Sequence, residues 1–168
     1  MATVAASIPE LIGLLDGSAR IEGDRLVVTD EAAFRGQAIE DLAWTQTFSD
    51  DAATVEAARW IIWEASQVLG ARSASIQELY AARARGEVKG FTVPAINIRI
   101  QAFDMARTVF ATAKAKAVGP LILELARSEQ TYTFQRVFEY APNCLAGAIA
   151  AGWVGPVFIQ GDHYQFNA

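Results

Sequence analysis

The Asp162-His163 dipeptide is the strongest chemical signal in the sequence, because it places the only histidine of the chain beside a carboxylate. It follows Gly161 and the apolar run Pro156–Gln160, which predicts a buried strand. In parallel α/β folds, active sites are built at the ends of such strands. A neutral imidazole is a good zinc ligand, and an adjacent carboxylate that points elsewhere can move a proton on a metal-held substrate.

This dipeptide is not a complete metal site. Zinc needs three or more ligands, and the chain has no second histidine and only one cysteine, Cys144, which is distant in sequence. The alternative is that Asp162 caps a following helix and that His163 is solvated. Cys144 lies in a helical stretch and is expected to be a small core residue.

Two more polar residues lie in or at the end of apolar runs. Asn97 ends the first predicted strand, where its amide can contact a substrate hydroxyl or carboxylate, or can instead cap the next helix. Glu124 interrupts the apolar run Leu121–Leu125, and a buried carboxylate requires a partner or a function. Pairing of Glu124 with a basic residue such as Arg99 or Arg127 is the simpler explanation.

Other candidate residues have structural explanations. Arg127, Ser128 and Glu129 follow the second strand and could bind an anion, although a solvated loop is the simpler interpretation. Trp60 and Trp63 are expected in the core or at an interface, rather than in a ligand cage.

The elements that position these residues alternate along residues 75–168. After a first helix, the pattern predicts strands at Phe91–Ile98, Leu121–Leu125 and Val157–Gln160, separated by helices. Short strands that are apolar on both faces and separated by helices are typical of a parallel sheet in an α/β fold. Three such strands leave a hydrophobic edge that another chain, more sequence or the N-terminal part must cover.

Residues 1–74 have a different pattern, which predicts a mainly helical N-terminal extension. A small hairpin is expected around Gly23. A long helix is predicted over Asp51–Leu69, with apolar residues at helical spacing and Gly70 as its stop. The predicted boundary between the extension and the second segment lies near residue 75.

Composition limits the class of protein. The chain has 168 residues, of which 52% are hydrophobic and 20% charged, as in a folded globular protein. Its net charge of −5 argues against a broad nucleic-acid surface. No apolar run is long enough for a membrane span, and the N-terminal residues do not read as a secretory signal. A single cysteine excludes an internal disulfide and fits a reducing compartment, so the cytoplasm is the expected location.

Four stretches of the second segment carry a resemblance to a known family through their order and spacing: Ile76–Ala82, Gly90–Asn97, Gly119–Leu125 and Gly155–His163. Their order and spacing resemble the opening of the class II, zinc-dependent fructose-bisphosphate aldolases. That family has a helix before its first strand, a Pro-Ala-x-Asn at the end of that strand, and an Asp-His at the end of its third strand. The resemblance covers about residues 75–168.

The resemblance implies the N-terminal part of a (β/α)8 TIM barrel, with its site at the C-terminal rim. His163 matches the family's first zinc ligand. Asp162 matches the catalytic aspartate, which exchanges a proton with the aldehyde-derived oxygen, and Asn97 matches a polar residue on the substrate side. In this family zinc polarises the ketone oxygen and stabilises an enediolate. The implied substrate is a ketose bisphosphate or a related sugar phosphate.

Three positions depart from the family pattern and leave the exact substrate open. Ala126 stands nearest the place of a serine that often approaches substrate phosphate. Gly161 stands where many members have threonine or another larger residue, and Tyr164 stands where some have cysteine or glycine. The remaining zinc ligands of the family lie on later strands, beyond residue 168, so this chain is expected to be inactive alone.

We therefore expect part of a zinc-dependent lyase that acts on a sugar phosphate. Its expected partners are a second copy or the remainder of the barrel, with no nucleic acid and no membrane. The alternative is a non-catalytic binding or scaffold protein, in which Trp44, Trp60 and Trp63 pack on a partner. A third possibility is another metal-dependent barrel lyase that acts on a different sugar acid or phosphate.

Overall fold

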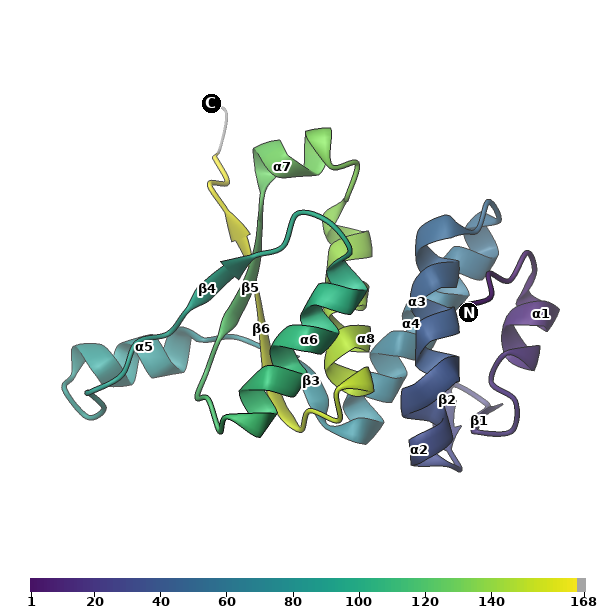
Figure 1. Cartoon of the computed structure of the whole chain (residues 1–168), viewed down its shortest axis with the longest axis horizontal. Coiled ribbons are helices and arrows are strands. Elements are labelled where there is room, and N and C mark those ends of the chain that lie inside the picture. The colour runs from purple at the N-terminus through teal and green to yellow at the C-terminus, as the bar shows by residue number, and fades with distance from the viewer. Residues whose placement is uncertain (166–168) are drawn as a thin grey trace.

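The computed structural model describes residues 1–165, which are arranged in layers (Figure 1). A parallel sheet forms one outer layer. Helices α6 (Ala102–Ala115) and α8 (Val137–Ala150) pack along one face of this sheet. Helices α3 (Ile39–Phe48) and α4 (Ala52–Leu69) contact α8 from its other side and form the next layer.

The sheet has four parallel strands in the order β3-β6-β5-β4. These are β3 (Ala71–Ala74), β4 (Ala95–Asn97), β5 (Ile122–Ala126) and β6 (Gly155–Asp162). The α/β class and the three parallel strands predicted after residue 75 are confirmed. The described sheet is open at both edges, so the expected TIM barrel stays a prediction.

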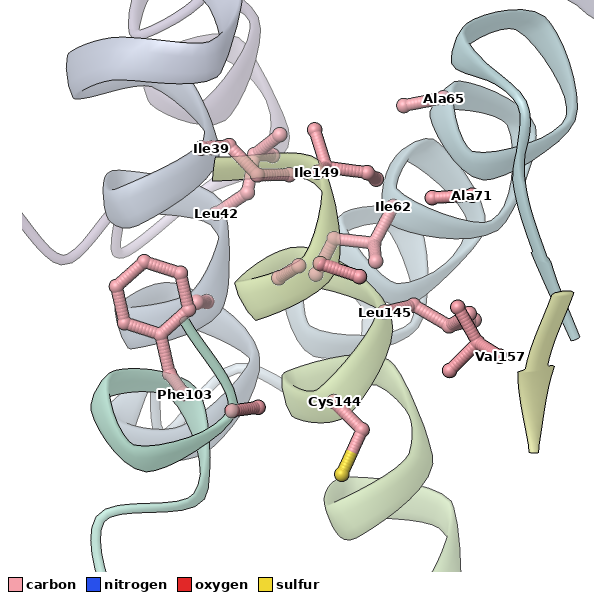
Figure 2. Close-up of a cluster of buried hydrophobic side chains, with 14 of the residues drawn as sticks. Ile39, Leu42, Ile62, Ala65, Ala71, Phe103, Cys144, Leu145, Ile149 and Val157 are labelled. Carbon is pink, nitrogen blue, oxygen red and sulfur yellow. The ribbon is translucent and has the colours of Figure 1, made fainter. Parts of the chain in front are cut away.

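Strand β3 was not predicted, and it comes from the segment before residue 75. It pairs with β6 from Ala71 opposite Gly155 to Ala74 opposite Phe158, and so covers one edge of the strands that follow. One hydrophobic cluster takes side chains from α3, α4, α6, α8 and the strands on both sides of residue 75 (Figure 2). The division into an extension, residues 1–74, and a second segment, residues 75–168, stays a prediction, but the core is continuous between them.

The smaller elements lie at the two ends of these layers. In the N-terminal part they are α1 (Ile8–Gly13), β1 (Ala19–Glu22), β2 (Arg25–Val28), α2 (Glu31–Ala33) and a π-helical turn, η1 (Phe34–Ala38). Strands β1 and β2 form the predicted antiparallel hairpin, with Gly23 in its turn. Helix α5 (Gln77–Ala84) extends away from the sheet and buries no side chain fully (Figure 1). Helix α7 (Arg127–Tyr132) directly follows β5.

Local signals set the ends of the long helix α4. The carboxylate of Asp51 accepts a hydrogen bond from the backbone N–H of Thr54 at 2.8 Å, which satisfies one of the free donors of the first turn. Gly70 ends the helix in a left-handed conformation, with φ of 79°. The predicted limits of this helix are therefore confirmed.

Helices α6 and α8 pack closely because α8 has a glycine at their contact. A Cβ added to Gly147 would lie 2.7 Å from the Cβ of Ala106 and 2.7 Å from the backbone nitrogen of Arg107. The helix also continues through Pro142. The break in the helical stretch lies earlier, at residues 133–136, so Pro142 falls in an early turn of α8.

The two faces of the sheet have different surroundings. Leu123 and Leu125 of β5 and Val157 of β6 belong to the core beneath α6 and α8. Because side chains alternate along a strand, Glu124 and Gln160 lie on the opposite face. Gln160 is exposed although its strand lies inside the sheet, so residues 1–165 leave this part of the face uncovered.

Candidate functional site

The carboxyl ends of β4, β5 and β6 bring the residues singled out in the sequence to one edge of the sheet. Asn97 is the last residue of β4, and Asp162 is the last residue of β6. The register places Glu124 of β5 beside Asn97 on one side and Gln160 on the other. By strand alternation, these four side chains lie on the uncovered face. His163 follows at the tip of β6.

The imidazole of His163 contacts Asp162 and does not diverge from it. Its Nε2 lies 3.2 Å from Oδ2 of Asp162, and the ring is 81% exposed. We expected neighbouring side chains at a strand end to point apart, but His163 has a left-handed backbone, with φ of 52°, which breaks the alternation. A carboxylate on one ring nitrogen leaves the other nitrogen available as a metal ligand.

The residues of this edge do not form a zinc site by themselves. Within residues 1–165, no group of three or more His, Cys, Asp or Glu side chains is arranged to hold a metal ion. A catalytic zinc needs three protein ligands, and His163 supplies one imidazole. The expected zinc would therefore need ligands from residues outside the described part of the chain.

Glu124 is the carboxylate whose protonation is most affected by this arrangement. Partial burial raises its pKa, and the negative charges of Asp162 and Glu129 raise it further, while His163 lowers it in part. A carboxylate with a raised pKa at an accessible edge accepts a proton more readily than an ordinary glutamate does. Glu124 is therefore a candidate acid or base beside Asp162.

We expected Glu124 to pair with a basic residue, and this expectation is wrong: neither Arg99 nor Arg127 pairs with it in the described residues. The guanidinium of Arg99 donates to Glu129 at 2.6 Å, and that of Arg127 donates to the backbone oxygen of Gln165 at 3.2 Å. No ion pair to Glu124 is found between residues 1 and 165. Both basic residues lie past the strand ends, which is why they reach other acceptors.

Glu129 has a larger structural role than its place in the sequence predicts. It was expected in a solvated loop, but it lies in α7 and is only 6% exposed. Its carboxylate accepts hydrogen bonds from Asn97 Nδ2 at 2.6 Å, Arg99 Nε at 2.6 Å and the backbone N–H of Ala126 at 3.0 Å. Burial would raise its pKa, but these hydrogen bonds and the charge of Arg99 outweigh it and lower the pKa to about 2.

A sequence signal for Glu129 existed. A glutamate three residues after the residue that precedes a helix often bonds back to the backbone N–H at the start of that helix. Glu129 has this spacing from Ala126, and its carboxylate accepts from that N–H.

Asn97 is oriented by Glu129 and does not cap a helix. The next helix, α6, begins only at Ala102, and Gln101 precedes it without a side-chain cap. While Nδ2 of Asn97 donates to Glu129, its Oδ1 is buried and has no hydrogen-bond partner among the described residues. A buried acceptor without a partner is unfavourable, so a donor from a ligand or from additional protein would stabilise this site.

Tyr164 folds back over the end of β6. A Cβ added to Gly161 would lie 2.5 Å from the Tyr164 ring, so the absence of a side chain at Gly161 allows the ring to approach the strand. The Tyr164 hydroxyl accepts a hydrogen bond from Nε2 of Gln130 in α7. Two of the positions that depart from the aldolase pattern are thus in direct contact.

Comparisons with protein-family profiles, with curated proteins and with solved structures gave no match to this chain. The aldolase resemblance therefore depends on the sequence motifs, and the chemistry proposed below depends on the geometry of the site. In residues 1–165, no helix combines the length and apolar character that crossing a membrane requires.

Proposed function

We propose that this chain carries proton-transfer and substrate-binding residues of a (β/α)8-barrel lyase of the class II aldolase type. The observation that supports this most is the arrangement of β4, β5 and β6, which are parallel neighbours in chain order with connecting helices on one face. The first strands of a barrel need this arrangement. Their uncovered face, with Asn97, Glu124 and Asp162, would become the interior of the barrel.

This proposal has a structural requirement at the edge of β6. In a barrel, the next strand in sequence would pair with β6 on the side away from β5. Strand β3 occupies that side, with four residues of which only Ala71 is buried. Barrel closure therefore requires β3 to be displaced from β6.

In the proposed reaction, Asp162 exchanges a proton with the substrate oxygen at the bond that is formed or broken. Asn97 offers its unpaired Oδ1 to a substrate hydroxyl, and Glu129 holds its amide in that orientation. When bound, zinc would supply Lewis-acid polarisation of a ketone oxygen. His163 would be one of its ligands, and the others would come from outside residues 1–165. The proposed substrate class is a ketose phosphate.

Asp162→Asn and His163→Ala in the complete native protein test this function. Cleavage of fructose 1,6-bisphosphate is measured by coupled NADH oxidation, and zinc by atomic absorption. Asp162→Asn should lower kcat by about 10²- to 10⁴-fold with zinc content unchanged, because one positioned acid or base contributes that much. His163→Ala should lower the zinc content.

Asp24→Asn serves as the control, since Asp24 lies in the hairpin turn between β1 and β2, distant in the fold from the carboxyl edge. Unchanged turnover in the Asp162→Asn variant would remove Asp162 from the reaction. Full zinc occupancy in the His163→Ala variant would remove His163 from the metal site.

A non-catalytic binding protein is the second candidate function. It is favoured by large apolar side chains that stay exposed on the helices, among them Trp63 at 47% and Phe138 at 61%. A complete protein that binds no zinc, cleaves no ketose phosphate and forms a stable complex through this surface would support this alternative.

A further inference from the structure

A cavity of about 370 Å³ lies on the other side of the core from the uncovered sheet face. Its walls come from α3, from the segment that leads into α6, and from the first turns of α8. Neither Asp162 nor His163 lines it, although Arg99, which donates to Glu129 at the carboxyl edge, lies on its wall. Its size is in the range of cavities that bind small molecules.

One wall of this cavity is aromatic. Trp44 and Phe48 lie one turn apart on α3, with ring centroids 5.2 Å apart and ring planes inclined by 47°. The two residues are 39% and 60% exposed, and Ile100, also on the lining, is 69% exposed. Apolar rings that line a cavity and remain open to solvent can stack on an aromatic ligand.

The polar part of the lining has an acceptor without a donor. Asn143 of α8 is 5% exposed, and its Nδ2 donates to Oγ1 of Thr47 at 3.1 Å. The Thr47 hydroxyl donates to the backbone oxygen of Ala43, so rotating the amide of Asn143 would leave its oxygen without a donor there too. Oδ1 of Asn143 has no partner in the part of the chain that the structure describes, which favours a ligand with an N–H group.

The charge of the lining favours a cation. Glu139 lies one turn before Asn143 on α8, and no ion pair to it is found among residues 1–165. Arg59, whose charge acts on Glu139, donates hydrogen bonds to Glu56 at 2.5 Å and to Gln46 at 3.2 Å.

The other charged groups of the lining are already neutralised. Arg99 pairs with Glu129, and Asp104 pairs with Arg107 at 2.7 Å. Glu139 is therefore the charged group on the lining that forms no ion pair among the described residues.

We propose that this cavity is a binding site for a small aromatic amine. The ring of the ligand would lie against Trp44 and Phe48, and its ammonium group would donate to Oδ1 of Asn143 and to the carboxylate of Glu139. This site does not depend on the proposed lyase function, because it shares no substrate contact with Asp162 or Asn97.

Titration of the ¹⁵N-labelled protein with 2-phenylethylamine, followed by NMR, tests the proposal. A ligand of this size should bind with a Kd of roughly 1 mM, from the usual free energy per non-hydrogen atom. The matched probe is 3-phenylpropionate, which has the same ring and the opposite charge. We expect it to bind at least about tenfold more weakly, since it would place a carboxylate beside Glu139.

Glu139→Gln should weaken binding of the amine by about tenfold and reduce the preference over the acid. Trp44→Ala should weaken both probes, and Glu78→Gln, an exposed acid on α5, should change neither. Circular dichroism checks that each variant is folded. Equal affinity for the two probes, an unchanged affinity in the Glu139→Gln variant, or shifts that map away from α3 and α8 would each overturn the proposal.

Discussion

Glu129 stabilises the carboxyl edge of the sheet, and its substitution by alanine is the most informative test of the structure. The substitution removes the acceptor for three hydrogen bonds, from Asn97, Arg99 and the backbone of Ala126. Arg99 is largely exposed and can bond to water instead, so the loss of its bond to Glu129 should cost little. The two remaining donors are left in a poorly solvated place, at about 1–3 kcal/mol each. We therefore expect the free energy of unfolding to fall by about 2–6 kcal/mol at pH 7.

The same network makes a prediction about pH. The pKa of Glu129 is about 2 in the folded protein, below its ordinary value of 4.5. A lowered pKa in the folded state means that the carboxylate stabilises the fold above pH 4.5. This contribution is lost as the pH falls from 4.5 towards 2. The difference in stability between the native protein and Glu129→Gln should therefore shrink over that range.

Urea denaturation followed by circular dichroism measures both effects. Curves are recorded at pH 7 and at intervals from pH 4.5 down to the lowest pH at which the native protein remains folded. Glu87→Ala is the control, since Glu87 forms an ion pair with Arg85 in which both side chains are more than half exposed. Such a pair should contribute little. A Glu129→Ala protein as stable as the native one at pH 7, or a difference for Glu129→Gln that does not change with pH, would refute this reasoning.

Two further predictions concern the core. Gly147→Ala would place a methyl group 2.7 Å from Arg107 N, and such overpacking costs about 1–3 kcal/mol, more than the gain of about 1 kcal/mol in helix propensity. Thermal unfolding should show a lower Tm for this variant and no loss for Gly13→Ala, where the added atom meets nothing within 4 Å; equal Tm values for both would contradict the close packing of α6 and α8. Burial raises the pKa of Cys144 to about 12, so its thiol should react with Ellman's reagent at pH 8 only as the protein unfolds. Rapid labelling of the native protein would show that Cys144 is accessible.

The long helix and the three later strands could be predicted because their signals are local. Asp51 caps the start of α4, and Gly70 ends the helix with a left-handed backbone. Both signals act within one turn of the helix. Strand β3 could not be predicted in this way. Its sequence is Ala-Arg-Ser-Ala, with one buried residue, and it is a strand because β6 pairs with it more than 80 residues later in the chain.

The candidate site shows the same limit. The positions of Asn97 and Asp162 could be predicted from the strand ends, because the carboxyl ends of parallel strands lie at the same edge of the sheet. The surroundings of Glu129 depend on Asn97, which lies 32 residues earlier, and its neighbours Arg127 and Ser128 look like a solvated loop. The position of the His163 ring depends on a left-handed backbone that a histidine rarely adopts, and no sequence pattern specifies it.

The contact between Gly161 and Tyr164 couples two positions that a sequence comparison would treat separately. A threonine at position 161 would collide with the ring of Tyr164, whereas a small residue at position 164 would leave the backbone of Gly161 open to water. A large side chain at position 161 therefore requires a small one at position 164. Any redesign of the surface at the end of β6 would therefore have to change Gly161 and Tyr164 together.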